Sequence, residues 1–159
     1  MGRSRDCTCV EFRDARSGDL PDVLALLRNA DLPSAGVAEK FSDFFVAEQD
    51  GRLIGVAGLE IYRSSALLRS VAVEDEWRGS GVGGRLIDLA LEKAKARGLE
   101  DVFLLTTTAE HYFPRFGFAC VSREAVSQDV KASMEFQGAC PASAVVMRRY
   151  LHDTASPPS

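Results

Sequence analysis

Arg78-Gly79-Ser80-Gly81-Val82-Gly83 is a glycine-rich stretch that stands between two runs of regular secondary structure. The apolar run before it, residues 67–73, is typical of a strand, and the run after it, residues 84–97, has the apolar spacing of a helix. Small residues let the backbone turn tightly and approach a ligand closely. The N–H groups and the dipole at the start of a helix favour an anion. The stretch therefore predicts a pyrophosphate cradle over residues 78–84.

The residues around the glycines disfavour two other phosphate-binding motifs. A P-loop places Lys, followed by Ser or Thr, after its last glycine, whereas Arg85 and Leu86 follow here. A dinucleotide-binding fold needs its first glycine at the strand end and a carboxylate after the next strand. Here residues 74–78 separate the strand from the first glycine, and the next strand ends in the threonines 106–108. Both departures count against a nicotinamide cofactor.

Two motifs resemble those of the GNAT family of N-acetyltransferases. Arg78, Gly81 and Gly83, after Val71-Ala72-Val73, form Arg-x-x-Gly-x-Gly and resemble motif A. Residues 109–118 resemble motif B, a short helix that ends in aromatic-Gly-Phe. The resemblance implies an α/β GNAT fold, with a mixed, mostly antiparallel sheet of six to seven strands. Helices would cover both faces of this sheet, and one pair of parallel strands would splay apart.

Length and composition indicate one domain. The chain has 159 residues, of which 46% are hydrophobic, and a formal net charge of −4, which disfavours a nucleic-acid surface. We expect a flexible lead-in at residues 1–9, a GNAT domain at 10–151 and a disordered tail at 152–159. No apolar run approaches the roughly 20 residues of a membrane span, and no signal peptide is evident, so a cytoplasmic location is expected. No metal site is expected at Cys7-Thr8-Cys9.

The hydrophobic pattern predicts the order of the elements. Strands are expected at residues 10–13, 44–49, 53–62, 66–73, 102–106, 118–121 and 144–147. Helices are expected at 17–28 capped by Ser17, at 37–41, at 81–97, from a Thr108 cap to near 117, and at 124–134. Because a helix joins strand 66–73 to strand 102–106, these two strands should be parallel.

The resemblance implies acetyl-CoA as the co-substrate and assigns residues to it. In the family, the turn and the helix start hold the pyrophosphate, and backbone amides of the preceding strand hold pantetheine and the thioester carbonyl. The implied cofactor-binding residues are Val71, Ala72, Val73, Arg78, Gly79, Ser80, Gly81, Val82, Gly83, Gly84, Thr107 and Phe113.

The catalytic acid and base are harder to assign. Many relatives place a tyrosine four residues before the motif B glycine, as the acid for the CoA thiolate. That position is Phe113 here, and a phenyl ring cannot donate a proton. Adjacent Tyr112 is one candidate acid, and water or another group is the alternative proton donor. Glu60, on the strand at 53–62 that precedes the motif A strand, is the candidate base, because partial burial suits a carboxylate to that role. An exposed strand residue is the alternative interpretation of Glu60.

Arg69 interrupts an otherwise apolar strand, and a charge there needs a partner. The partner is either a substrate carboxylate or a structural carboxylate of the protein. Residues 58–60, 67–73, 104–109 and 140–144 resemble the acetyltransferases named for arsenic-resistance operons. The threonine run at 106–108 also resembles the acetyltransferase domain of N-acetylglutamate synthases. Both resemblances imply an amino acid or a similar acceptor, with Arg69 and Ser143 on the acceptor side.

The sequence thus predicts an acyltransferase that moves an acetyl group from acetyl-CoA to the primary amine of a small molecule. That molecule would be an amino acid or a toxic amino-acid analogue. Two alternatives stay open: an acetyltransferase for protein N-termini or lysines, and a non-catalytic acyl-CoA-binding regulatory module. No nucleic acid or membrane partner is expected, and a homodimer is expected by analogy alone.

Overall fold

The computed structural model describes residues 10–32, 34, 36–39, 41–106, 111–132 and 144–151. Predictions for residues 1–9 and 152–159, and for the Thr108 cap, lie outside the described residues. The strands are β1 (Glu11–Asp14), β2 (Phe44–Gln49), β3 (Arg52–Ile61), β4 (Ser65–Val73), β5 (Asp101–Thr106), β6 (Ala119–Val121) and β7 (Val145–Tyr150). The α-helices are α1 (Leu20–Asn29), α2 (Val82–Ala96) and α3 (Gln128–Lys131).

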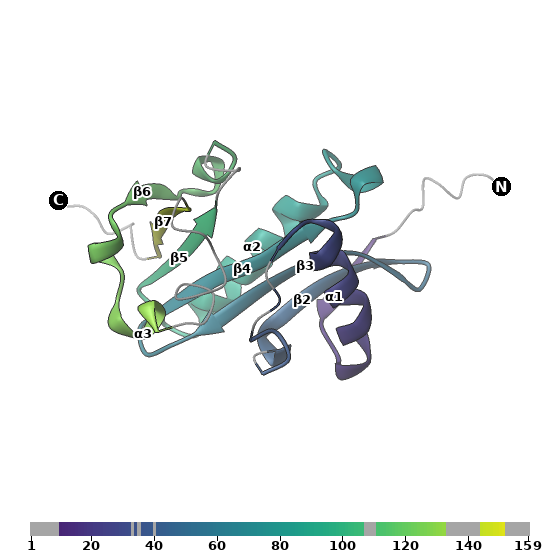
Figure 1. Cartoon of the computed structure of the whole chain (residues 1–159), viewed down its shortest axis with the longest axis horizontal. Helices are drawn as coiled ribbons and strands as arrows, with labels where there is room; N and C mark the ends of the chain where they lie inside the picture. The colour runs from purple at the N-terminus through teal and green to yellow at the C-terminus, as the bar shows by residue number, and fades with distance from the viewer. Residues whose placement is uncertain are drawn as a thin grey trace.

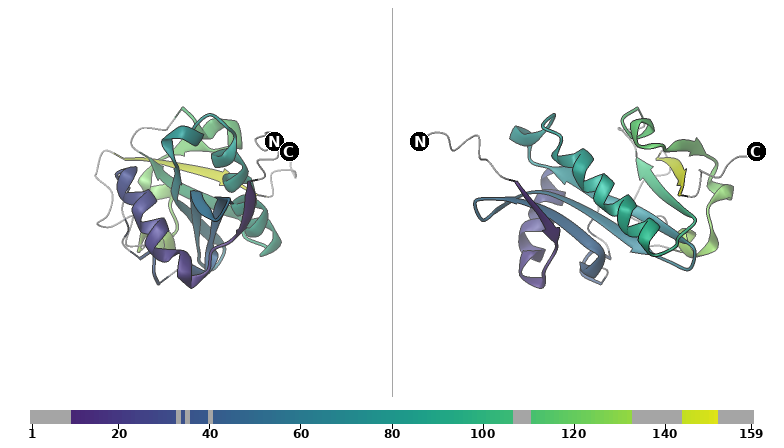
Figure 2. Two further views of the ribbon diagram at one scale, coloured as in Figure 1. Left: turned by 90° about the vertical axis from the view of Figure 1, so that its right-hand side faces the viewer. Right: turned by 180° about the vertical axis from the view of Figure 1, so that it is seen from behind.

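The strands form one seven-stranded sheet in the order β1-β2-β3-β4-β5-β7-β6 (Figure 1). Its described strand pairs are antiparallel except for β4 and β5, which are parallel as the joining helix requires. Helix α1 covers one face of the sheet and α2 covers the other (Figure 2). The predicted mixed sheet with helices on both faces is confirmed.

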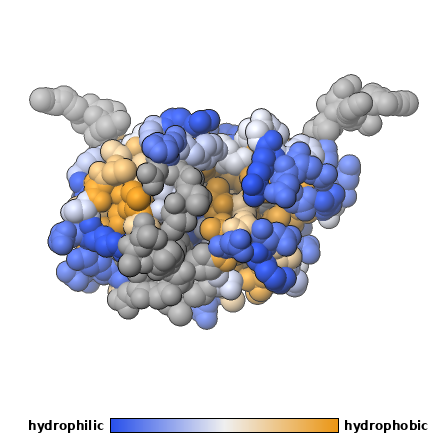
Figure 3. Space-filling view, turned by 45° about the horizontal axis from the view of Figure 1, so that its top comes forward, coloured by the Kyte–Doolittle hydropathy of each residue, from blue (hydrophilic) through white to orange (hydrophobic). Residues whose placement is uncertain are grey.

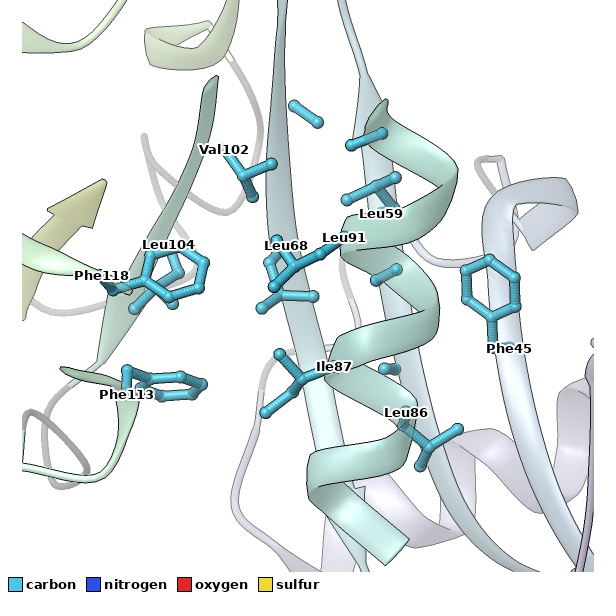
Figure 4. Packing of buried hydrophobic residues seen from close by; sticks show 14 of the residues in the cluster. Phe45, Leu59, Leu68, Leu86, Ile87, Leu91, Val102, Leu104, Phe113 and Phe118 are labelled. Atoms are coloured by element: carbon cyan, nitrogen blue, oxygen red, sulfur yellow. The ribbon is translucent and has the colours of Figure 1, made fainter. Parts of the chain in front are cut away.

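Two hydrophobic clusters join these layers. Every fourth residue of α2 from Leu86 points inward, so Leu86, Ala90 and Ala94 are fully buried against β2, β3 and β4 (Figure 4). On the opposite face, α1 residues such as Val23 and Leu27 pack against Phe44 and neighbouring side chains of β2 and β3. Side chains alternate between the two faces along β3 and β4, so both strands contribute residues to both clusters.

Turn residues end the elements where the sequence predicts. Asp50 and Gly51 have φ of 52° and 79° and connect β2 to β3 in a tight hairpin. Gly98, with φ of 76°, follows the end of α2. No helix among the described residues is long and apolar enough to cross a membrane.

Two predicted helices differ from the structure in the first part of the chain. Ser17 does not cap α1: it lies in a 3-10 turn (Ser17–Asp19), and the carboxylate of Asp19 instead accepts the Arg16 N–H at 2.7 Å. Residues 36–39 form a turn, and a 3-10 turn follows at Phe41–Asp43. Glycine at 36, with φ of 78°, favours this turn over a helix.

The motif B segment and the segment after it are also shorter than predicted. Phe113–Phe116 is a 3-10 turn with Pro114 near its start, and it ends at Gly117, whose φ is 90°. The predicted helix 124–134 is divided into a 3-10 turn (Arg123–Ala125) and α3. Ser127 starts α3, because its Oγ accepts the Val130 N–H at 3.4 Å.

Candidate active site

The cradle is a strand, a turn and a helix, as predicted. After β4, a 3-10 turn (Asp75–Trp77) leads through the glycine-rich loop into α2. Gly79 and Gly81 have φ of 80° and 94°, a left-handed conformation that glycine adopts without a steric penalty. Gly81 caps α2, and its carbonyl accepts the Arg85 N–H at 3.0 Å. The N–H groups of the first turn of α2 have no carbonyl partner within the helix, so this end suits an anion.

The motif B aromatic residues pack on the first turn of α2, beside Gly83 and Gly84. A Cβ at Gly83 would lie 3.4 Å from Val73 Cγ2 and 3.5 Å from Tyr112 Oη. A Cβ at Gly84 would lie 3.4 Å from Cζ of Phe116. Two segments far apart in the sequence therefore meet at the cradle.

The polar side chains of the cradle have partners close by in the chain. Arg78 Nη2 lies 3.2 Å from Asp75 Oδ1 in an exposed ion pair, which solvent weakens. Ser80 Oγ donates to the Trp77 carbonyl and lies 3.4 Å from the Val82 N–H. The Arg78 guanidinium is thus at the surface, beside the loop. The face drawn in Figure 3 carries hydrophobic patches among hydrophilic residues.

The parallel strands separate next to the cradle. Pairing of β4 with β5 covers only Ser65–Leu68 with Asp101–Leu104. Beyond that point, Ala72 and Val73 pair with β3 on one side, while β5 continues to pair with β7. The backbone edge of Val71–Val73 that faces β5 therefore has no strand partner in this sheet. The predicted splayed pair is confirmed.

A left-handed residue lies where the strands separate. Ser70, inside β4 and 7% exposed, has a φ of 59°. The register of β3 and β4 shifts here, so that Ser70 and Val71 together lie opposite Ala57. The sequence analysis missed this bulge, since nothing in the local sequence of a strand demands a left-handed serine.

Glu60 and Arg69 form a buried ion pair on the α1 side of the sheet. Arg69 Nη1 donates to Glu60 Oε2 at 2.6 Å, with side-chain exposures of 0% and 4%. Tyr62 Oη donates to Glu60 Oε1 at 2.5 Å, and Arg69 Nε donates to Ser70 Oγ at 3.1 Å. Of the two partners predicted for Arg69, the structure shows a carboxylate of the protein itself, that of Glu60. Glu60 is buried, so its interpretation as an exposed strand residue is wrong.

Tyr112 and Phe113 lie on the other side of the sheet. Phe113 is 7% exposed and packs edge-to-face on Phe118, and both face Ile87 and Leu68 in the close-up (Figure 4). Tyr112 is half-buried, and this desolvation raises its pKa above 10.0, although the nearby Arg115 opposes the shift. The guanidinium of Arg115 lies 4.7 Å from the centre of the Tyr112 ring.

The structure therefore brings the candidate residues to two sides of the separated strands. The side chains of Val71 and Val73, the cradle glycines and Tyr112 meet on the α2 side, whereas Glu60 and Arg69 lie on the α1 side. A reaction that uses both groups of residues would take place where β4 separates from β5. Thr107 and Ser143 lie outside the described residues.

The same architecture is found in known proteins. A family model described as the acetyltransferase (GNAT) domain matches residues 40–120. The chain belongs to this family. The match contains β2, β3, β4, the cradle, α2, β5 and the motif B segment.

Individual family members are similar over different shares of their length. An amino-acid acetyltransferase of Mycobacterium tuberculosis is 30% identical over 138 residues, which are 80% of this chain and 78% of the relative. An amino-acid acetyltransferase of Neisseria meningitidis is 29% identical over 126 residues, 72% of this chain but 28% of the relative. The N-acetylglutamate synthase of Neisseria gonorrhoeae, complexed with coenzyme A and N-acetyl-glutamate, superposes with a TM-score of 0.79 at 27% identity. That superposition covers 90% of this chain and 35% of the synthase, so the chain spans about a third of the Neisseria proteins.

Proposed function

We propose that this chain is an acetyl-CoA-dependent N-acetyltransferase whose acceptor is the primary amine of an amino acid or a similar small molecule. The observation that carries the proposal is the separation of β4 from β5 directly beside the cradle. A cradle for phosphates and an unpaired strand edge suit a long ligand with a pyrophosphate and an amide-rich arm. The amino-acid acetyltransferases and the synthase among its relatives support this choice of ligand and acceptor.

The co-substrate would run along residues that the sequence analysis assigned. The pyrophosphate would meet the N-terminus of α2 at Gly81–Gly84, next to Arg78, and pantetheine would follow the open edge of Val71–Val73. Phe113 and Thr107 would lie along the remaining part of the ligand. Backbone N–H groups of this edge would polarise the thioester carbonyl.

The reaction itself needs little acid–base help once both substrates are held together. The amine nitrogen attacks the thioester carbon, a C–N bond forms, the C–S bond breaks, and the thiolate leaves with a proton. Glu60 is the proposed acceptor of the amine proton, and Tyr112 is the proposed donor to the thiolate.

Arg69 and Ser143 are the proposed acceptor-side residues, with Arg69 as the partner of a substrate carboxylate. The Arg69 guanidinium is closed to solvent in this structure and held by Glu60. A carboxylate would therefore reach it only after the atoms that cover it have moved. A purely structural ion pair is the competing role for Arg69 and Glu60.

Other acceptors and roles remain predictions. Acetylation of protein N-termini or lysines, and a non-catalytic acyl-CoA-binding role, are the alternatives. A toxic analogue as acceptor rests only on the resemblance to acetyltransferases of arsenic-resistance operons. The cytoplasmic location, the homodimer and the lack of nucleic acid or membrane partners also rest on the sequence alone.

The test is thiol release from acetyl-CoA with a panel of the twenty amino acids and with peptides bearing free N-termini or lysines. We expect steady turnover with one or a few amino acids and little with peptides. Turnover with peptides alone would favour the protein acetyltransferase. Binding of acetyl-CoA without turnover in any mixture would favour the non-catalytic module.

A further inference from the structure

Two aromatic rings of the motif B segment lie against the cradle. The hydroxyl of Tyr112, directly before the 3-10 turn Phe113–Phe116, would lie 3.5 Å from a Cβ at Gly83. Cζ of Phe116 would lie 3.4 Å from a Cβ at Gly84. The two rings also contact each other, with their centres 5.3 Å apart. The position of this turn therefore shapes one wall of the cradle.

The hydrophobic core anchors the turn at one side. Phe113 and Phe118 are 7% and 2% exposed, and their rings lie together in the core (Figure 4). Phe116, which ends the turn, is only half-buried. The strand that follows, β6, has three residues and pairs with β7. The Phe116 end of the turn therefore depends more on polar contacts than on burial.

Arg149 of β7 supplies such a contact. Its Nη1 donates to the Phe116 carbonyl at 2.7 Å. Carbonyls in the last turn of a helical segment lack partners within it, and basic side chains nearby can satisfy them. A hydrogen bond from a charged donor is also stronger than one between neutral groups. Because Arg149 pairs with Val102 of β5, the contact joins the turn to the sheet.

Gly117 lets the Arg149 side chain cross the end of the turn. A Cβ at Gly117 would lie 3.2 Å from Cδ and 3.3 Å from Nε of Arg149, which is closer than most side chains allow. Gly117 also has a φ of 90°, which disfavours any other residue. The backbone conformation and the approach of Arg149 therefore require glycine here for two separate reasons.

We propose that Arg149 is a positioning residue for acetyl-CoA. It holds the Phe116 end of the motif B turn, and through it keeps the rings of Tyr112 and Phe116 against the first turn of α2. It acts through the turn and does not itself touch the ligand. This inference rests on the proposed function, in which the pyrophosphate meets Gly81–Gly84. A wall that is already in place lowers the cost of ordering the site when the ligand binds.

The loss of this contact should loosen the turn without unfolding the protein. Phe113 and Phe118 would still be held in the core, because neither depends on the guanidinium of Arg149. Segments with few buried contacts open locally at a lower free energy than the core. Ligand affinity and the mobility of the turn should therefore change together, while the melting temperature changes little.

Three variants separate this role from a general effect of removing an arginine. Arg149→Met keeps an unbranched apolar side chain but removes the donor. Arg149→Lys keeps the charge and a donor, although not the planar guanidinium. Arg148→Met is the matched control: Arg148 is the neighbouring residue on the opposite face of β7. Its guanidinium lies 5.6 Å from the centre of the Phe103 ring and donates to the Ala125 carbonyl at 3.4 Å.

The experiment measures the dissociation constant of acetyl-CoA by calorimetry, the melting temperature, and amide hydrogen exchange over residues 111–118. We expect Arg149→Met to weaken binding on the order of tenfold and to speed exchange in this segment by a similar factor, as for a lost charged hydrogen bond. Arg149→Lys should stay within about threefold of the wild type. Arg148→Met should leave affinity and exchange unchanged, even where it lowers the melting temperature.

Salt separates this role from a direct attraction between Arg149 and the phosphates. The loss of affinity in Arg149→Met should be the same at about 0.05 M and about 0.5 M salt, because a contact within the protein is not formed with the ligand. A direct attraction between exposed charges would be screened at the higher concentration. A loss that disappears at high salt would therefore overturn the proposal.

Unchanged affinity in Arg149→Met, or an equal loss in Arg148→Met, would also overturn the proposal. Wild-type protein that binds no acetyl-CoA would reject the proposed function, and the role of Arg149 in binding with it. If Arg149→Met does not fold, Gly117→Ala replaces it, since the added Cβ would push Arg149 away from the Phe116 carbonyl. Acetyl-CoA affinity should then fall with faster exchange over 111–118, and unchanged affinity would contradict the proposal.

Discussion

Glu60 and Arg69 sit on neighbouring strands and are joined by a hydrogen-bonded ion pair of 2.6 Å that is closed to solvent. Each residue is a candidate from the sequence on separate grounds, Glu60 as a base and Arg69 as a carboxylate anchor. Their contact means that a substitution of either residue changes the charge environment of the other. For each variant of this pair, both the unfolding free energy and the turnover must therefore be measured.

Glu60→Gln tests the proposed base. We expect turnover to fall at least tenfold, because an amide cannot accept the amine proton. Acetyl-CoA affinity should be retained, since the glutamine oxygen can still accept from Arg69. Stability should fall by about 3 kcal/mol, because the buried guanidinium loses its counter-charge. Unchanged turnover in folded protein would remove Glu60 from the mechanism, and Glu48→Gln, in a half-buried pair with Arg13, is the control.

Replacing both partners separates structure from function. The double variant Glu60→Leu with Arg69→Met leaves no unpaired charge at this position, so its unfolding free energy should lie within about 1–2 kcal/mol of the wild type. Its amino-acid turnover should nevertheless be lost, because the proposed base and the proposed partner of the substrate carboxylate are both gone. Urea unfolding and thiol release measure the two quantities. Full activity in this stable variant would show that the pair has only a structural role.

Tyr112→Phe tests the proposed acid. Turnover should fall by about 10²-fold if the hydroxyl protonates the leaving thiolate, and Tyr150→Phe, at an exposed position, should change nothing. Burial raises the pKa of Tyr112 above 10.0, so the folded state keeps the proton where the unfolded state begins to lose it. This contribution to stability is complete below pH 10 and declines as the pH rises above that value. Turnover in Tyr112→Phe equal to wild type would assign proton donation to water or another group.

Gly58→Ala tests the packing beneath the bulge. A Cβ at Gly58, which lies opposite Arg69, would come within 2.3–2.6 Å of the Phe44 ring. Because Phe44 is fully buried, we expect a loss of about 1–3 kcal/mol in unfolding free energy, measured in urea. Gly18→Ala meets no atom within 4 Å and should change stability by less than about 0.5 kcal/mol. A stable Gly58→Ala variant would mean that the Phe44 ring moves freely.

Much of the fold follows from local sequence signals. Strand β2 was predicted with its observed bounds, Phe44–Gln49, because an apolar run meets a strong Asp-Gly turn signal. The glycine-rich turn before a helix, together with the crossover rule, predicted the cradle and the parallel pair. These features depend on neighbours in the chain, which a sequence displays directly.

The features that the sequence did not predict depend on contacts between residues distant in the chain. The left-handed Ser70 is imposed by the β3–β4 register and by Arg69, and neither is visible in a linear sequence. The contact between Glu60 and Arg69 likewise requires the register of two strands. The motif B segment was predicted as a helix, but Pro114 and the left-handed Gly117 limit it to one 3-10 turn.

Binding of acetyl-CoA is the central claim, and a thermal shift with acetyl-CoA, NAD and ATP tests it most directly. At about a hundredfold excess over its dissociation constant, a ligand should stabilise the fold by roughly 2.7 kcal/mol. We predict a shift with acetyl-CoA alone, lost in Gly81→Glu, which adds a negative charge and a strained side chain to the cradle. Gly18→Glu, with the same charge on an exposed turn, should keep the shift. No shift with acetyl-CoA, or a shift with NAD instead, would contradict the account.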